Sequence, residues 1–209
     1  MQDFIAVLDF GSQYAHLISK RIRHIGAYTK IFSPSSSEAT LAEAKGIVLS
    51  GGPASVNSSN VPKFNSKLLE LDKPILGLCY GHQLIAQSFG GSISNTGKGE
   101  FGKTILEQKS YSPLWENISF PNQVWMSHQD SATKCPKEFD VTAETENGIL
   151  AAMKHRQRPI FTLQFHPEVT DTTHGKIMLK NFVNACGVSS TWSMGTFIDV
   201  TIHRLSNEV

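Results

Sequence analysis

The sequence is poor in cysteine, in long apolar runs and in charge of one sign. Its three cysteines (Cys79, Cys135 and Cys186) are odd in number and widely spaced, which excludes a disulfide framework. Its apolar runs are far shorter than the roughly 20 residues that a membrane-spanning helix needs. The 19 basic and 18 acidic residues leave a formal net charge of +1, and no block of Lys or Arg offers a surface for nucleic acid or an anionic membrane.

The first residues, Met1–Asp3, lead directly into an apolar run and show neither the basic region nor the cleavage site of a secretory signal. Hydrophobic residues make up 40% of the chain and charged residues 18%, which are values of a globular protein rather than of a disordered one. Composition therefore excludes secreted, fibrous, membrane and DNA-binding proteins. It predicts a cytoplasmic α/β protein.

Short β-rich runs alternate with helical patterns in the first half of the sequence. Four runs are predicted to be strands, at residues 4–8, 27–32, 46–49 and 75–78, and the first is continuously apolar, as expected of a strand buried on both faces. Two helical patterns lie between or after them, at residues 14–25 and 81–89. In the first helix, Ile18, Ile22 and Ile25 form one apolar stripe, and Gly26 is placed to end it. This alternation predicts an α/β fold with a parallel sheet and helices on both faces.

The second half has shorter, hairpin-like runs. Candidate strands lie at residues 104–107, 124–127, 141–144 and 149–153. A buried strand at 160–164 and an amphipathic helix at 175–186 follow. The prediction is an open, mostly parallel sheet with helices on both faces and a small antiparallel sheet in the second half. Residues 1–189 form the predicted domain, and 190–209 a linker that leads to another one.

The sharpest local signal is the segment Gly77–Gly81, with Cys79 at its centre, between a buried strand and a helix. A nucleophile on such a turn is held in a strained conformation above the sheet, and small residues two positions away allow the chain to turn that sharply. The helix N-terminus favours negative charge on the sulfur. A buried structural cysteine is the alternative, and it is the favoured interpretation for Cys135 and Cys186.

A cysteine nucleophile needs a base, and the best candidate follows the strand at 160–164. Residues two apart in extended chain point to the same side, so that Glu168 can orient the imidazole of His166 toward the thiol. Both segments follow predicted parallel strands, and open α/β sheets place their sites at the carboxyl ends of such strands. The remaining histidines are weaker candidates, and most are expected to be solvated: His16, His24, His82, His128, His155, His174 and His203.

The third segment is the glycine turn Leu49–Pro53. Backbone without a side chain can bring an amide close to a reacting carbonyl, as an oxyanion hole requires, and the amide of Tyr80 is a second donor. An ordinary Gly-Pro loop is the alternative. The segment lacks the lysine and Ser/Thr of a phosphate-binding loop, and no Cys/His cluster has zinc spacing, so no metal site is predicted.

Taken together, these segments resemble the class I (triad) glutamine amidotransferases. The resemblance rests on Gly-Leu-Cys-Tyr-Gly-His-Gln at 77–83, His-Pro-Glu at 166–168 and Leu-Ser-Gly-Gly-Pro at 49–53. Within that family, the segments 8–14, 124–130 and 164–170 are similar to the amidotransferase half of GMP synthetases. The similarity covers essentially the whole chain and implies a flavodoxin-like fold.

The resemblance also implies catalytic roles. Cys79 attacks the side-chain amide of glutamine, with His166 as base and then as acid to the leaving ammonia, while Glu168 holds His166. The backbone amides of Gly52 and Tyr80 stabilise the oxyanion. Water then hydrolyses the glutamyl thioester to glutamate, and no cofactor is expected in this domain.

By the same resemblance, Gln83, Ser127 and Asp130 line the glutamine pocket, and Asp130 faces the α-ammonium group. A turn or capping role is the alternative for Asp130. Two residues depart from the pattern of many bacterial members: Gln129 stands where glycine is frequent, and His82 where methionine is frequent.

The last segment, 192–204, resembles the stretch by which fused GMP synthetases enter their ATP pyrophosphatase domain. That partner domain, fused or separate, would use ATP and Mg²⁺ to activate XMP for amination by the released ammonia. Alternatives are an amidotransferase component of anthranilate, aminodeoxychorismate or carbamoyl phosphate synthesis, a general thiol hydrolase, and a non-catalytic flavodoxin-like module in which Cys79 only packs.

Overall fold

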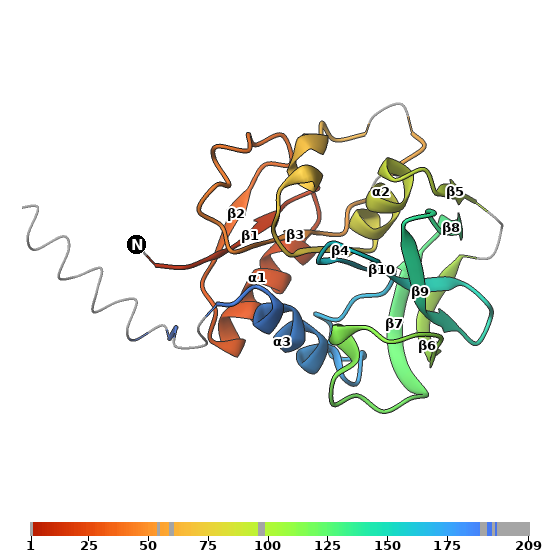
Figure 1. The fold of residues 1–209 in the computed structure, drawn as a ribbon. Coiled ribbons are helices and arrows are strands. Elements are labelled where there is room, and N and C mark those ends of the chain that lie inside the picture. The colour runs from red at the N-terminus through yellow and green to blue at the C-terminus, as the bar shows by residue number, and fades with distance from the viewer. Residues whose placement is uncertain are drawn as a thin grey trace, which may run out of the picture.

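The computed structural model describes residues 2–53, 55–58, 61–95, 99–188, 192, 193 and 195. Five strands run parallel: β1 (Ile5–Leu8), β2 (Thr29–Phe32), β3 (Gly46–Leu49), β4 (Ile75–Leu78) and β11 (Ile160–Leu163). Four more continue the sheet in antiparallel pairing: β6 (Glu100–Gln108), β7 (Asn122–His128), β9 (Phe139–Thr145) and β10 (Leu150–His155). Together they form a nine-stranded sheet in the order β2-β1-β3-β4-β11-β10-β9-β6-β7 (Figure 1).

Helices cover both faces of the parallel half of the sheet. In Figure 1, α1 (Tyr14–Ile25) and α3 (Gly175–Ala185) lie below the sheet and α2 (Tyr80–Ser88) lies above it. Two single 3-10 turns are also present, η1 (Ser66–Glu70) and η2 (Pro113–Trp115). None of the described helices combines the length and apolar character that crossing a membrane requires.

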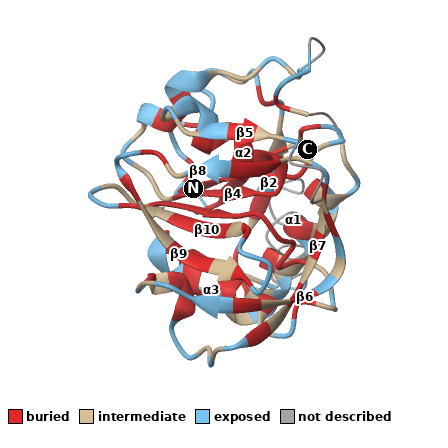
Figure 2. Ribbon diagram, turned by 90° about the vertical axis from the view of Figure 1, so that its right-hand side faces the viewer, coloured by how far each residue is buried: buried red, intermediate tan, exposed pale blue. Residues whose placement is uncertain are grey.

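The two layers of core explain why the central parallel strands β1, β3 and β4 are apolar throughout. Ile5 and Val7 of β1 pack in the cluster that contains α1 and α3, whereas Ala6 and Leu8 pack in the cluster that contains α2. Successive side chains of a strand point to opposite faces, so both sets must be apolar when both faces are covered. Figure 2 shows the resulting band of buried strands through the centre of the molecule.

The predicted flavodoxin-like α/β fold is confirmed. The helix predicted over 14–25 has the bounds of α1, and Gly26 ends it with a φ of 101°, in the left-handed region that favours glycine. The antiparallel part differs from the expectation, because pairing of β10 with β11 joins the hairpin strands to the main sheet. A separate two-stranded sheet consists of β5 (Ser92–Ser94) and β8 (Ser131–Lys134), which are too short to leave a clear sequence pattern.

Most of the predicted linker at 190–209 lies outside the described residues, as does the predicted boundary at 189. Trp192 is described and lies against the end of α1. Its amide donates to the Gly26 carbonyl at 2.8 Å, and its ring stacks on Tyr28 with centroids 5.9 Å apart. The chain that follows α3 therefore returns to the end of α1.

Gly46 provides a test of how closely α3 approaches the sheet. A Cβ on Gly46 would overlap the sulfur of Cys186, the buried residue at the end of α3. We expect Gly46→Ala to lower the free energy of unfolding by about 1–3 kcal/mol in urea denaturation, because this packed site has no room for a methyl group.

The double variant Gly46→Ala/Cys186→Ala serves as the control, because it removes the overlapping sulfur. It should lose less stability than the sum of the two single variants. Additive losses would show that the close approach of β3 to α3 is not what makes the alanine unfavourable.

Candidate active site

Cys79 lies on a strained turn between β4 and α2. Its φ of 51° and ψ of −101° are unusual for any residue with a side chain. A Cβ on Gly77 would come within 2.6 Å of the Gly81 carbonyl oxygen, and one on Gly81 within 2.5 Å of the Leu49 carbonyl oxygen. Glycine is therefore required on both sides of Cys79, for the steric reason that the sequence pattern suggests.

His166 and Glu168 form a buried pair just after β11. Nδ1 of His166 lies 2.8 Å from Oε1 of Glu168, and the two side chains are 1% and 0% exposed. The backbone here is held on both sides: the His166 amide donates to the Trp125 carbonyl at 3.1 Å, and the Thr172 hydroxyl donates to the His166 carbonyl at 2.7 Å. Arg21 of α1 donates through Nε to the Glu168 carbonyl at 2.8 Å. The orientation of the imidazole is thus set by several elements.

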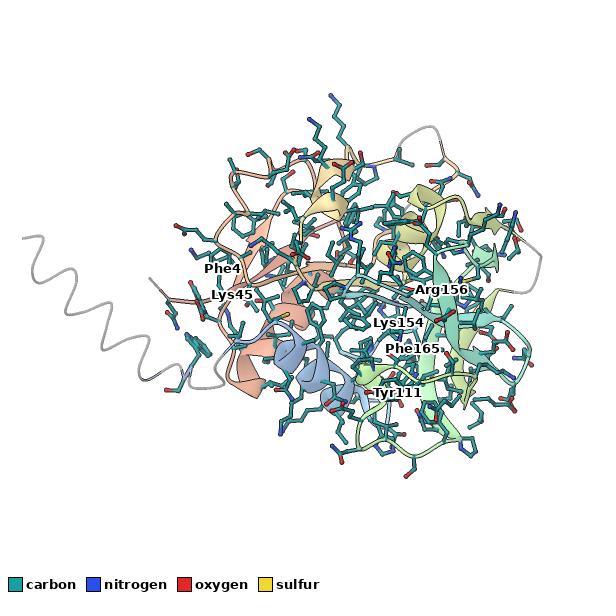
Figure 3. The ribbon with its side chains drawn as sticks, in the orientation of Figure 1. Phe4, Lys45, Tyr111, Lys154, Arg156 and Phe165 are labelled. Carbon is teal, nitrogen blue, oxygen red and sulfur yellow. The ribbon has the colours of Figure 1, made fainter. Side chains whose placement is uncertain are left out.

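Aromatic packing holds the same segment. Phe165, which precedes His166, is fully buried in the interior of the molecule (Figure 3). The ring of Tyr14, at the start of α1, lies on the His166 ring with centroids 4.4 Å apart. These contacts leave the imidazole little freedom to rotate.

The charge of Glu168 decides the protonation of His166. Burial by itself lowers the pKa of His166, but the Glu168 carboxylate and the nearby Cys79 sulfur both favour the protonated ring. The net result is a pKa well above the usual imidazole range. Nε2 of His166 is buried and has no hydrogen-bond partner of normal geometry among the described residues, and besides Glu168 the side chain that influences the charge of the ring is Cys79.

The thiol and the imidazole meet beside Gly51. A Cβ on Gly51 would lie 3.2 Å from Cε1 of His166 and 3.6 Å from Cβ of Cys79, so the two side chains approach the same point of bare backbone. The Cys79 sulfur also lies 3.8 Å from Nε2 of Gln164 and 3.7 Å from the Ser127 carbonyl. Gln164 is fully buried, and its sequence context gave no indication of a role.

These groups open into a cavity of about 660 Å³. Seven of the eight predicted site residues line it: Cys79, His166, Gly52, Tyr80, Gln83, Ser127 and Asp130. The eighth, Glu168, lies behind His166 and reaches the cavity only through it. No site role was predicted for the remaining lining residues, although most of them lie in the segments 8–14, 49–53 and 124–130 that carry the resemblance: Gly11, Ser12, Gln13, Tyr14, Pro53, Ser55, Asn95, Phe101, His128 and Gln129.

A carboxylate lies at one side of the cavity. The Asp130 side chain accepts a hydrogen bond from the Ser55 hydroxyl, and its carbonyl accepts one from Nε2 of Gln83 at 2.7 Å. Gln129, beside it, keeps an ordinary backbone conformation, because Cys79 and Asn117 are the only described non-glycine residues with positive φ. The backbone at this position therefore does not require glycine.

The two predicted oxyanion donors are adjacent at the cavity wall. A Cβ on Gly52 would lie 3.0 Å from the Phe10 carbonyl oxygen and 3.5 Å from Cγ of Tyr80, so Gly52 is packed where no side chain fits. The amide of Tyr80 belongs to the first turn of α2, where N–H groups have no partner within the helix. Both residues line the cavity, and their role as oxyanion donors stays a prediction.

The expectation that the other histidines are mostly solvated is wrong for His82, His128 and His155, which are buried. Burial and the charge of nearby His128 lower the pKa of His82 to about 3, and its Nδ1 lies 2.9 Å from the Thr162 hydroxyl. His82 is buried because this face of α2 packs on the sheet. His16 and His24 are exposed as expected, and His203 lies outside the described residues.

No cluster of three or more His, Cys, Asp or Glu side chains within the described ranges is arranged to hold a metal ion. The polar groups of the cavity instead suit an organic ligand with an amide or carboxyl group at the thiol and a cationic group at Asp130.

The pKa of His166 can be tested directly. In a Glu168→Gln variant, the charge that favours the protonated ring is gone while the burial remains, so the pKa of His166 should fall. Titration of the imidazole by NMR measures this. Glu138→Gln, which alters the partner of His155 instead, should leave the His166 titration unchanged; an equal fall in both variants would contradict the assignment to Glu168.

Comparison with known proteins supports one family. The family model "Glutamine amidotransferase class-I" matches residues 6–186. The chain is 40% identical over 210 residues to a glutamine-hydrolysing GMP synthase of Brachyspira hyodysenteriae, covering 99% of this chain and 41% of that protein. It is 43% identical over 206 residues to one of Eremothecium gossypii, covering 97% and 39%. The chain thus spans about two fifths of the length of these relatives.

Solved structures agree with the fold. A protein of Thermoplasma acidophilum, described as a candidate GMP synthase subunit, superposes with a TM-score of 0.79 and 30% identity, over 90% of this chain and 95% of that one. A glutamine amidotransferase from Thermotoga maritima, with a TM-score of 0.72 and 16% identity over 90% of this chain and 100% of that one, shows the same fold. Because the matched family region extends from β1 to the end of α3 and includes Cys79, His166 and Glu168, the chain belongs to the class I glutamine amidotransferases.

Proposed function

We propose that this chain is the glutaminase part of a GMP synthase: it hydrolyses glutamine through a cysteine thioester and supplies the ammonia that aminates XMP. The observation that carries the proposal is the buried His166–Glu168 pair facing Cys79 in one cavity, with the carboxylate of Asp130 at its side. The names of the relatives favour GMP synthesis over the other pathways that use amidotransferases.

In the proposed first step, the thiol proton of Cys79 passes to Nε2 of His166, as the raised pKa of the imidazole favours, and the resulting thiolate attacks the side-chain amide carbon of glutamine. A carbon–sulfur bond forms while the carbonyl becomes an oxyanion, which the amides of Gly52 and Tyr80 stabilise. Collapse of this intermediate breaks the carbon–nitrogen bond, and His166 gives its proton to the departing ammonia. The raised pKa of His166 suits this second role, because an imidazolium must be present when the ammonia leaves.

The second step reverses the same proton transfers. Water adds to the glutamyl thioester while His166 accepts its proton, and collapse of the intermediate releases glutamate and returns the proton to the sulfur. Glu168 transfers no proton in this scheme. It holds the Nδ1–H of His166 and stabilises the positive ring, as its buried 2.8 Å contact supports.

The glutamine pocket follows from the shape and charge of the cavity. Asp130 would pair with the α-ammonium group, since a carboxylate is the natural partner of an ammonium ion. Gln83 and Ser127 line the same space and would contact the rest of the amino acid. No step of this scheme needs a cofactor in this chain.

The synthetase half of the reaction belongs to a second domain in this proposal. An ATP pyrophosphatase domain, fused or in trans, would bind ATP, Mg²⁺ and XMP, and would consume the ammonia released here. Residues 190–209 would connect to it. The predicted cytoplasmic location is part of the same proposal.

Glutamate release from glutamine tests the chemistry and the pathway together. We expect release by this chain to rise when an ATP pyrophosphatase partner, XMP, ATP and Mg²⁺ are all present. If glutamate release rises without any dependence on XMP, the assignment to GMP synthase would be contradicted. The assignment to the amidotransferases would still hold.

Variants of the triad test the residue roles. Cys79→Ala and His166→Ala should lower glutamate release on the order of 10³-fold or more, and Glu168→Ala should lower it less, because Glu168 orients rather than transfers the proton. Cys135→Ala is the matched control: burial and the charge of Asp140 raise the pKa of Cys135 to about 11, and this thiol should be dispensable. Retained hydrolysis in Cys79→Ala would overturn the mechanism.

A further inference from the structure

A second buried histidine–carboxylate pair lies behind the cavity wall. Glu100 of β6 and His128 of β7 are directly paired in the sheet, with Nε2 of His128 3.6 Å from Oε2 of Glu100. Their side chains are 9% and 1% exposed. Neither residue belongs to the triad, and the mechanism above does not use the pair.

Two neighbouring side chains hold one oxygen of Glu100 by hydrogen bonds. Its Oε1 accepts from the Thr145 hydroxyl at 3.0 Å and from Nδ2 of Asn147 at 2.8 Å. Burial by itself raises the pKa of Glu100, but these bonds and the nearby imidazole of His128 outweigh it, and the pKa is lowered overall. A buried anion requires a positive partner, and His128 is the basic side chain that faces it among the described residues.

The other ring nitrogen of His128 fixes the tautomer. Nδ1 lies 3.0 Å from the Asp130 carbonyl oxygen, which can only accept, so Nδ1 carries a proton. The other nitrogen, Nε2, faces Oε2 of Glu100 at 3.6 Å, a distance longer than a hydrogen bond, so the two side chains lie close together without a direct bond. Beside His128, His82 of α2 stays neutral, because its pKa is about 3.

The His128 ring is bonded to the backbone of the proposed substrate pocket. The Asp130 carbonyl is held by two donors, Nδ1 of His128 at 3.0 Å and Nε2 of Gln83 at 2.7 Å. The Asp130 carboxylate, in the same residue, is held separately by the Ser55 hydroxyl. The carbonyl and the carboxylate of Asp130 are thus held by different residues, and both Asp130 and His128 line the cavity.

His155 and Glu138 form another histidine–carboxylate pair, but the hydrogen bonds of the His155 ring differ from those of His128. It is buried and lies 3.7 Å from Glu138, but its Nδ1 accepts hydrogen bonds from the amides of Gln157 and Arg158 at 3.1 and 3.0 Å. An accepting Nδ1 carries no proton, so this ring is neutral, and burial lowers its pKa. His155 does not line the cavity and holds only its own turn, which makes it a matched control.

We propose that His128 and Glu100 are a positioning pair for glutamine recognition: through the Asp130 carbonyl, they hold the Asp130 carboxylate where it binds the α-ammonium group of the substrate. The inference rests on the proposed function, since it concerns the same pocket. The pair acts through Asp130 and takes no part in the proton transfers at Cys79.

The test uses the chloromethyl ketone analogue of glutamine, whose carbon–chlorine bond breaks as a carbon–sulfur bond forms with Cys79. Labelling of this chain is followed by mass spectrometry over a range of reagent concentrations, which separates the half-saturating concentration from the maximal rate. We expect His128→Leu to raise the half-saturating concentration about tenfold, as loss of one well-placed buried hydrogen bond implies. Glu100→Gln should raise it in the same direction, and the maximal rate should stay within about twofold because the triad is intact.

A second reagent without the α-amino group makes the test specific. In the unchanged chain, the amine should improve binding; in His128→Leu most of that advantage should disappear, because the carboxylate is no longer held toward the amine. His155→Leu removes a buried, carboxylate-paired histidine elsewhere and should leave both half-saturating concentrations unchanged. Thermal unfolding of each variant verifies that it is folded. If His128→Leu is not folded, the labelling of Glu100→Gln tests the positioning role instead.

Three results would overturn the positioning role. The first is that both variants keep the half-saturating concentrations of the unchanged chain. The second is an equal rise for the two reagents, and the third is unfolding of both variants at the labelling temperature, because each of these two results would indicate a purely structural pair. Failure of the proposed function would look different: the unchanged chain would then show no saturable labelling of Cys79 at all.

Discussion

The parallel pairing of β4 with β11 is the constraint on which the candidate site depends. Leu78 stands beside Leu163 in this pairing, and the Cys79 amide donates to the Leu163 carbonyl at 2.8 Å. The two strands therefore end together, and the turns that follow them carry Cys79 and His166. Residues far apart in the chain thus share one sheet edge, where open α/β folds place their chemistry.

The side chains at this sheet edge keep their positions only because the residues around them are rigid. Glycines at 51, 77 and 81 allow backbone and side chains to approach more closely than any larger residue would permit. Buried polar contacts then fix directions: Glu168 orients His166, and Gln164 connects the Cys79 sulfur to Gln83, whose amide donates to Gln164 at 3.3 Å and to Asp130. Each polar group is costly to bury alone, but within a satisfied network it gains a single orientation.

The parts of the site that could be predicted from the sequence share one property: their signal is local. The glycines around Cys79 indicate a tight turn that larger residues could not form. The spacing of His166 and Glu168 places both side chains on one face of a short segment. Gln164, Tyr14 and the His128–Glu100 pair have no such signal, because their partners come from other elements. The burial of His128 depends on the antiparallel pairing of β6 with β7, and this pairing is not visible in either strand by itself.

The sequence by itself determined the α/β class, the bounds of α1, the strained turn at Cys79 and the local His166–Glu168 unit, because each follows from periodicity or from steric limits within a few residues. Tertiary structure alone decided that the hairpin strands extend the main sheet and that three histidines are buried. Those features depend on which distant elements pack together. Burial then sets the charge of each group, and charge decides what the cavity can bind.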